Sequence, residues 1–105
     1  MKIHDSADEE LRAAVAYYEA CEKGLGDEFF AEVLRGFEQI GQQPQTWPAT
    51  YQDYRRYLIH RFPYALVYRY SAEETLILAI AHTHRRPGYW RERVRQTDDQ
   101  LTPGV

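Results

Sequence analysis

The fold is decided by one unbroken apolar stretch, Thr75-Leu-Ile-Leu-Ala-Ile-Ala81. Its length and almost uniform apolar character predict a strand that is buried on both faces and lies near the centre of a sheet. This strand leads directly into His82-Thr-His-Arg-Arg-Pro-Gly-Tyr-Trp-Arg-Glu-Arg93. It therefore carries imidazoles, guanidiniums and two large aromatic rings to one surface. Such groups suit binding of anions, bases or carboxylate-rich partners better than packing in a core.

Two more strands are predicted before this one. Residues 64–70 form the nearer strand, and residues 71–74 form a short hairpin loop that joins it to the apolar strand. Residues 56–62 alternate well enough for the other strand, with Leu58, His60 and Phe62 on one face. Pro63 cannot donate to a strand ladder, so it marks the break between the two strands. Residues 44–50 are predicted as a loop in which Trp47 covers an edge of the core.

The N-terminal half predicts two helices joined as a hairpin. Ser6 and Glu9 form a capping box for the first helix, and Gly24 is its predicted C-terminal cap. Asp27 caps the second helix, which Pro44 ends. The short link makes the two helices antiparallel neighbours. The apolar stripes predicted to face the core are Ala7, Leu11, Ala14, Val15, Tyr18 and Cys21 in the first helix and Phe30, Val33, Leu34, Phe37 and Ile40 in the second.

Charge is divided unevenly along the chain. Residues 1–50 carry ten Asp or Glu against four Lys or Arg, and most of these acids, Glu10 among them, are predicted to form a solvated outer helix face. Residues 51–95 carry nine Arg and no Lys against four acids. Planar guanidiniums favour bidentate contacts to phosphate or carboxylate, so any functional charge is predicted in this second half. The alternative interpretation is that these arginines lie on solvated strand faces and at a helix C-terminus.

Length and composition limit the class of protein. A chain of 105 residues predicts one domain, over residues 1–95, followed by a polar, frayed C-terminal tail over residues 96–105. The single Cys21 excludes an internal disulfide framework and favours a reducing, cytoplasmic setting. No apolar stretch approaches the length that a membrane span needs, so no membrane partner is expected.

The order of these elements, together with several short motifs, resembles the RelE/ParE superfamily of type II toxin–antitoxin toxins. The resemblance covers about residues 7 to 93 and is most specific where Phe62-Pro-Tyr64 is followed by His82, Arg85 and Pro87-Gly-Tyr-Trp90. Other matching positions are Glu10-Leu11, Tyr17-Tyr-Glu19, Gly24-Leu-Gly26, Phe29, Glu32-Val33, Ile40, Pro44, Trp47-Pro48, Arg55-Arg56, Leu58, Arg61, Val67-Tyr68, Ile77–Ala81 and Arg93.

The resemblance implies an α+β fold, in which the αα hairpin packs on a small curled antiparallel sheet and a short C-terminal helix or tail follows. It implies a cognate antitoxin as partner, which would contact operator DNA itself, and no cofactor. Members of the superfamily either poison DNA gyrase, as ParE-like toxins do, or cleave mRNA in the ribosome without a metal. Members usually begin with a full first strand, whereas only residues 2–4 precede the first helix here. Three alternatives follow: the first strand is very short, the true start lies upstream, or a partner supplies the missing edge. A complex or a dimer is expected.

Residue identities favour the ParE-like branch. The ribosome-dependent branch has a catalytic Arg where this chain has Ala65, and paired Lys residues where it has Arg56 and Leu58. Loss of a cation that stabilises the transition state costs orders of magnitude in rate. A ParE-like toxin that binds DNA gyrase is therefore predicted. The alternatives are a ribosome-dependent endoribonuclease that uses Arg56, Arg61, Arg85 and Tyr89, and a degenerate toxin that retains only antitoxin binding.

The predicted target-binding surface consists of Arg56, Arg61, His82, His84, Arg85, Tyr89 and Arg91. Structural roles are also open: His82 could cap its strand, Tyr89 and Trp90 could close the end of the core, and Arg55 and Arg56 could pair with the acidic helices. His82 and His84 lack a third ligand, so no metal site is predicted.

Overall fold

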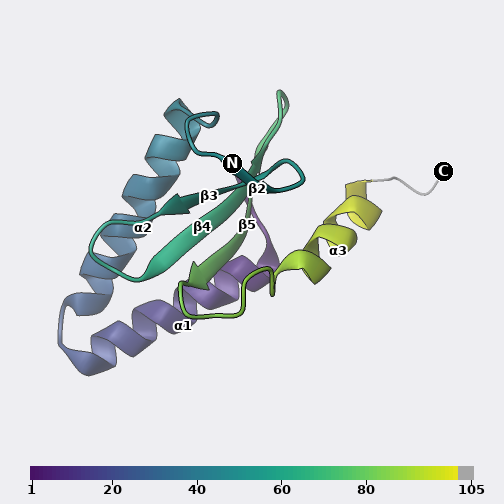
Figure 1. Ribbon diagram of the computed structural model, residues 1–105. Helices are drawn as coiled ribbons and strands as arrows, with labels where there is room; N and C mark the ends of the chain where they lie inside the picture. Colours follow the sequence, from purple (N-terminus) through teal and green to yellow (C-terminus); the bar gives the residue numbers. More distant parts are fainter. Residues whose placement is uncertain (102–105) are drawn as a thin grey trace.

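The computed structural model describes the backbone of residues 1–101 and the side chains of residues 1–96. Two helices precede most of a five-stranded sheet, and a third helix follows it, which confirms the α+β class (Figure 1). In chain order the elements are β1 (Lys2–Ile3), α1 (Asp5–Cys21), α2 (Leu25–Gln42), β2 (Ala49–Tyr51), β3 (Tyr54–Leu58), β4 (Tyr64–Tyr70), β5 (Thr75–His82) and α3 (Arg91–Leu101).

The sheet is mixed, with the strand order β1-β5-β4-β3-β2. Neighbouring strands are antiparallel except β1, which runs parallel to β5 through the pairs Lys2–Leu76 and Ile3–Ile77. The sheet is thus antiparallel from β2 to β5, as expected, and departs from the expected antiparallel pairing only at β1. The α1–α2 hairpin carries the chain to the opposite edge, and the antiparallel reversals from β2 to β5 then bring β5 back alongside β1 in the same direction. Strand β1 is very short, with two residues, as one of the three alternatives expected.

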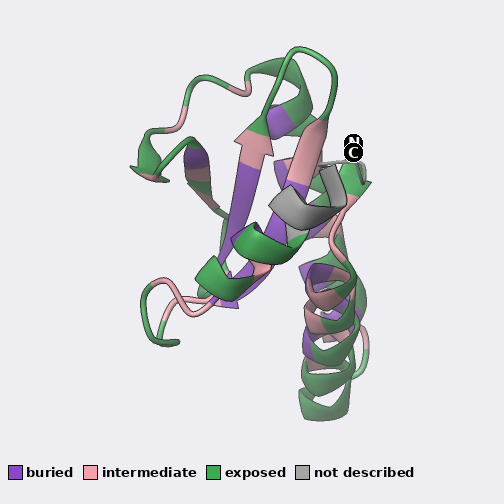
Figure 2. Cartoon of the chain, turned by 90° about the vertical axis from the view of Figure 1, so that its right-hand side faces the viewer, coloured by how far each residue is buried: buried purple, intermediate pink, exposed green. Residues whose placement is uncertain are grey.

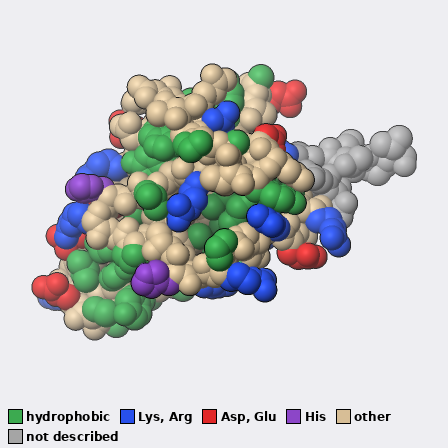
Figure 3. Space-filling view, viewed as in Figure 1, with side chains coloured by type: hydrophobic (Ala, Val, Ile, Leu, Met, Phe, Trp, Pro, Cys, Tyr) green, Lys and Arg blue, Asp and Glu red, His purple; other side chains and the backbone are tan. Residues whose placement is uncertain are grey.

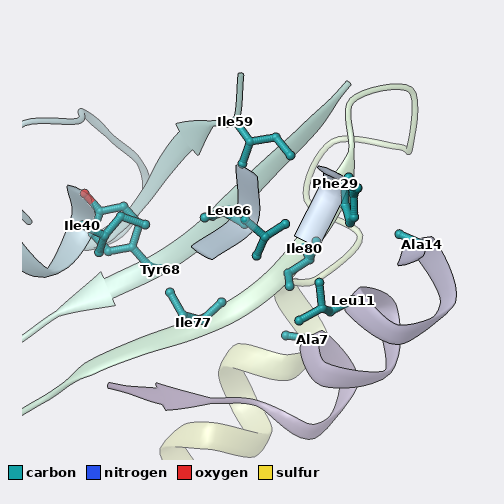
Figure 4. Packing of buried hydrophobic residues seen from close by; sticks show 11 residues of the cluster. Ala7, Leu11, Ala14, Phe29, Ile40, Ile59, Leu66, Tyr68, Ile77 and Ile80 are labelled. Carbon is teal, nitrogen blue, oxygen red and sulfur yellow. The ribbon is translucent and has the colours of Figure 1, made fainter. Parts of the chain in front are cut away.

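Strand β5 is apolar on both faces because both faces are covered. On one face α1 and α2 pack against β4 and β5 through Leu11, Phe29, Leu66, Ile77 and Ile80 (Figure 4). On the other face Trp90 and the first turns of α3 pack over a second cluster, consisting of Tyr54, Val67, Leu78, Ala79, Trp90 and Val94. Figure 2 shows that buried residues are concentrated in the strands and on the inner sides of the helices.

A bulge at Leu78 determines which residues of β5 face each of the two clusters. Tyr68 pairs with Ile77 and Val67 pairs with Ala79, so Leu78 has no partner of its own in β4. An extra residue interrupts the alternation of a strand. Ile77 and Ile80 consequently face the helices, while Leu78 and Ala79 both face the second cluster.

The ends of the first two helices differ from the prediction. His4, not Ser6, caps α1, since its Nδ1 accepts the Ser6 N–H at 3.1 Å. Gly24 does not end α1 but precedes α2, with a left-handed φ of 87° that favours glycine. The Glu19 carboxylate accepts the N–H groups of Gly24 and Gly26, so it satisfies donors at the start of α2. Cys21 is exposed and does not join the apolar stripe.

The buried face of α2 is rotated relative to the predicted stripe. Phe29, Val33 and Ile40 are buried, whereas Phe30 and Leu34 remain 40% and 46% exposed. Two glycines on the buried face allow this rotation because they permit close packing. A Cβ atom on Gly26 would lie 2.7 Å from the Val15 carbonyl oxygen, and one on Gly36 would lie 2.6 Å from Leu66 Cδ1.

Strand β4 matches the prediction for residues 64–70, but its neighbour is shifted. Strand β3 spans Tyr54–Leu58 instead of residues 56–62, and the unpredicted β2 pairs with it. Arg61 has a φ of 73°, which is incompatible with an extended strand, so His60 and Phe62 lie in a loop. Trp47 covers a core edge as predicted, with its ring centroid 4.7 Å from the ring centroid of Tyr57.

The C-terminal segment is helical over its described part. Helix α3 continues to Leu101, within the segment predicted as a frayed tail, and residues 102–105 lie outside the described residues. No helix in the described part of the chain is long and apolar enough to cross a membrane.

A pair of matched glycine substitutions tests the close packing of α2. Gly26→Ala places a methyl group against a backbone oxygen of α1, while Gly41→Ala, in the same helix, meets nothing within 4 Å. Both substitutions raise the helix propensity, so the difference between their free energies of unfolding measures the cost of the clash. We expect Gly26→Ala to be less stable than Gly41→Ala by about 1–3 kcal/mol in urea denaturation. Equal stabilities would contradict the packing described.

Candidate functional site

A groove of about 350 Å³ lies on the face of the sheet opposite α1 and α2, between the strands and the segment that follows β5. Its walls and floor come from β2, β3, β4, the end of β5 and the start of α3. Figure 3 shows this face, where Lys and Arg side chains lie among hydrophobic ones in the middle and acidic side chains lie toward the margins. The lining residues are Thr50, Tyr51, Arg56, Val67, Ala81, His82, Thr83, Arg85, Arg86, Pro87, Gly88, Tyr89, Trp90 and Arg91.

Five of the seven predicted target-binding residues line this groove: Arg56, His82, Arg85, Tyr89 and Arg91. Arg61 and His84 do not line it. Arg61 instead lies 3.7 Å from the Glu28 carboxylate of α2, and its guanidinium lies 5.3 Å from the Phe62 ring centroid.

The predicted target-binding residues did not include Arg86, Thr50 and Tyr51, which also line the groove. Arg86 adjoins Arg85 and could have been found by that adjacency. Tyr51 joins the groove only because the unpredicted β2 pairs with β3.

Two groove arginines rest on tyrosine rings. The Arg85 guanidinium carbon lies 4.1 Å from the Tyr89 ring centroid, and that of Arg91 lies 4.3 Å from the centroid of Tyr51. Stacking restrains a guanidinium while its in-plane N–H donors remain available for bidentate contacts. No Asp or Glu lines the groove, and within the described side chains Arg56, Arg85, Arg86 and Arg91 have no ion pair. The groove therefore presents donors suited to oxyanions such as carboxylate or phosphate.

His82 is oriented by a backbone contact, which agrees with its alternative role as a cap of the strand. Its Nδ1 accepts the His84 N–H at 3.0 Å, so a neutral ring carries its proton on Nε2. The ring also packs edge-on against Tyr64, with centroids 5.1 Å apart. His82 thus adds a further donor to the groove lining.

Glu10, predicted as part of a solvated helix face, organises the wall of the groove. Its Oε2 accepts a hydrogen bond from the Tyr89 hydroxyl at 2.5 Å. Its two oxygens also accept hydrogen bonds from the two terminal nitrogens of Arg93, at 2.8 and 2.9 Å. The Ile80 N–H donates to Oε1 at 3.0 Å. The Glu10 and Arg93 side chains are only 18% and 16% exposed. One carboxylate therefore joins α1, β5, the loop before α3 and α3 itself.

These contacts shift the pKa values of the groups involved. Burial raises the pKa of Glu10, but hydrogen bonds from Arg93, Tyr89 and the Ile80 N–H outweigh it and leave the pKa below the usual 4.5. Burial and the hydrogen bond to Glu10 raise the pKa of the Tyr89 hydroxyl well above its usual value. Burial lowers the pKa of Arg93, and its contacts with Glu10 more than reverse that effect. Glu10 is consequently ionised and Tyr89 protonated at neutral pH.

The Glu10–Arg93 pair also takes the place of a neighbouring strand. Strand β1 ends at Ile3, opposite Ile77, so the second half of β5 has no strand on that side. There Glu10 accepts the Ile80 N–H, and Arg93 donates to the Leu78 carbonyl oxygen at 3.2 Å. Backbone groups at a sheet edge that would otherwise be unpaired are satisfied in this way.

The remaining candidates have structural roles. The Arg55 guanidinium donates to the Trp47 carbonyl oxygen at 2.6 Å and to that of Gln45 at 3.3 Å, so it anchors the loop before β2 and does not pair with the acidic helices. Trp90 is 6% exposed and closes the second cluster, as expected for a core residue. No group of three or more His, Cys, Asp or Glu among the described residues could hold a metal ion.

A comparison with protein families places this geometry in context. The model of the family described as the ParE toxin of the type II toxin–antitoxin system parDE matches residues 1–87. The chain belongs to the ParE toxin family. Within this ParE-family chain the matched segment includes Glu10, Arg56 and Arg85, whereas Tyr89, Arg91 and Arg93 lie beyond it. A comparison with curated proteins finds no match.

Substitution of Glu10 tests its role as the link between these elements. Glu10→Gln keeps the shape but leaves Arg93 without its countercharge, so we expect a loss of about 1.5–3 kcal/mol in the free energy of unfolding. The matched control is Glu9→Gln, at the neighbouring exposed position, which should change stability by less than about 0.5 kcal/mol. Equal effects of the two substitutions in urea denaturation would show that Glu10 does not link α3 to the sheet.

The lowered pKa of Glu10 predicts an acid-dependent loss of stability. A carboxylate whose pKa is lower in the folded than in the unfolded state stabilises the fold above its unfolded value, here 4.5. That stabilisation decreases as the pH falls from 4.5 through the lower folded pKa. Other carboxylates titrate in the same range, so the measured quantity is the stability difference between the unmodified chain and Glu10→Gln from pH 7 to pH 3. We expect this difference to shrink on acidification, and a constant difference would contradict the assignment.

Proposed function

We propose that this ParE-family chain is a growth-inhibiting toxin that acts by binding its target through the cationic groove. DNA gyrase is the proposed target, and a cognate antitoxin is the proposed inhibitor. The observation that carries the proposal is a groove lined with arginines, two of them stacked on tyrosine rings, in which no lining residue is placed as a general base.

Ribonuclease chemistry needs a group that removes the proton of a ribose hydroxyl. The Nδ1 lone pair of His82 is occupied by the His84 N–H, and its other nitrogen carries the proton in the neutral ring. The Tyr89 hydroxyl donates to Glu10, and its raised pKa keeps it protonated. Arg61, one of the proposed ribonuclease residues, lies outside the groove. These features favour docking over the endoribonuclease alternative.

The support of the groove also favours a binding role. The segment that forms one wall is held through Tyr89 and Arg93 by Glu10, and through Trp90 by the second cluster. A preorganised surface loses less conformational entropy when it binds a partner. We expect the antitoxin to neutralise the toxin by covering this surface, to contact operator DNA itself, and to act with the toxin in the cytoplasm.

Induction of the gene without its antitoxin tests this function. We expect growth arrest with DNA damage and gyrase–DNA adducts. Arg85→Ala should reduce growth inhibition at least tenfold, measured as colony survival at equal expression, because it removes a stacked donor from the groove. The control Arg12→Ala changes an arginine on α1 whose side chain is 78% exposed and should leave toxicity unchanged.

Other outcomes would identify the alternatives. Arrest with cleavage of mRNA in the ribosomal A site and intact DNA would support the endoribonuclease. No growth effect would support a degenerate toxin that only binds its antitoxin. Full toxicity of Arg85→Ala would show that the groove is not the working surface.

A further inference from the structure

We propose that the groove recognises an acidic protein segment that places a bulky apolar side chain beside its carboxylates, and that Leu58 is the apolar contact. The inference rests on the proposed function, because it assigns a chemical class of partner to the same surface. Leu58 is 58% exposed at the end of β3, whereas the next residue, Ile59, is 6% exposed and belongs to the core. The chain thus leaves one large apolar side chain outside its own core at this point.

Strand register places Leu58 beside the groove. Leu58 pairs with Ala65 of β4, and Ala65 pairs with Ala81 of β5, so these side chains form one row across the same face of the sheet. Ala81 lines the groove, as does Arg56, which lies two residues before Leu58 and therefore on the same face. Ala65 and Ala81 are buried, at 0% and 8% exposed, so Leu58 is the member of this row that reaches the solvent. An exposed apolar side chain consequently lies beside the cationic groove.

The guanidiniums indicate the charge of the partner. Arg85 and Arg91 are supported by two different rings, Tyr89 in the loop before α3 and Tyr51 in β2. Each can form its own bidentate contact with an oxyanion. Among the described residues, the lining contains no acid that would compete for them. A partner segment that carries at least two carboxylates complements this arrangement.

Two features favour a protein over a nucleic acid as the source of these oxyanions. Single-stranded nucleic acid is bound largely by stacking of bases on aromatic faces, but guanidiniums already stack on the rings of Tyr51 and Tyr89. The exposed Leu58 has no counterpart in a phosphate backbone and suits an apolar side chain.

Peptide binding to the purified full chain tests the proposal. The probes are a fluorescein-labelled 12-residue peptide of glutamates with one central leucine, the same peptide with serine in place of that leucine, and a labelled 12-nucleotide single-stranded DNA, compared by fluorescence anisotropy at one salt concentration. We expect the leucine peptide to bind at least fivefold more tightly than the serine peptide. Leu58→Ser should remove this difference, and Leu58→Met should retain it. The control Leu34→Ser changes a leucine that is 46% exposed on α2 and should have no effect.

Two results would overturn the inference: tighter binding of the oligonucleotide than of the leucine peptide, or an unchanged preference for leucine in Leu58→Ser. Circular dichroism of each variant checks that it is folded. If Leu58→Ser is not folded, Leu58→Met keeps the inference testable, because loss of the leucine preference in that variant would contradict it. The outcome is separable from that of the proposed function. If the leucine peptide is not preferred while Arg85→Ala still reduces toxicity, only this inference fails. If the peptides bind as expected but the induced chain is harmless, only the proposed function fails.

Discussion

The carboxylate of Glu10 is the contact on which the arrangement of this protein depends. It lies on α1, yet it receives hydrogen bonds from the backbone of β5, from Tyr89 in the loop before α3 and from Arg93 in α3. A largely buried carboxylate is costly unless its oxygens are fully bonded. Here it has four donors, two of them on one guanidinium. Separating these segments would leave the largely buried carboxylate without its donors. The contact therefore holds α1, β5 and the segment that ends in α3 together.

The position of the groove follows from this contact. The segment between β5 and α3 carries Arg85 and Arg86, two of the four arginines that line the groove, and its aromatic residues, Tyr89 and Trp90, attach it to Glu10 and to the second core cluster. Arg85 stacks on the same tyrosine ring whose hydroxyl is held by Glu10. One side chain therefore both attaches this segment to Glu10 and supports an arginine of the groove. A change to Glu10 is expected to reach the groove although Glu10 does not line it.

Several elements were predictable because local patterns specify them. The apolar run of β5 and the strand at residues 64–70 need only a count of apolar residues and turn residues. The faces of α2 and the bounds of β3 were not predictable, because glycine packing and a left-handed residue at Arg61 decide them. The mixed sheet is likewise a matter of topology, since a two-residue strand carries no signal of its direction. The bulge at Leu78 leaves no trace in a uniformly apolar stretch.

The sequence by itself determined the α+β class, the division of charge between an acidic first half and an arginine-rich second half, and the motifs that indicate a ParE-like toxin. These features depend on composition and on residues close together along the chain. Only the tertiary structure decided which of the candidate residues share a groove, because Arg56, Tyr51 and Arg85 come from separate elements. It also decided that Glu10 is a buried link, since an exposed acid on a helix and one that meets Arg93 from the far end of the chain look alike in sequence.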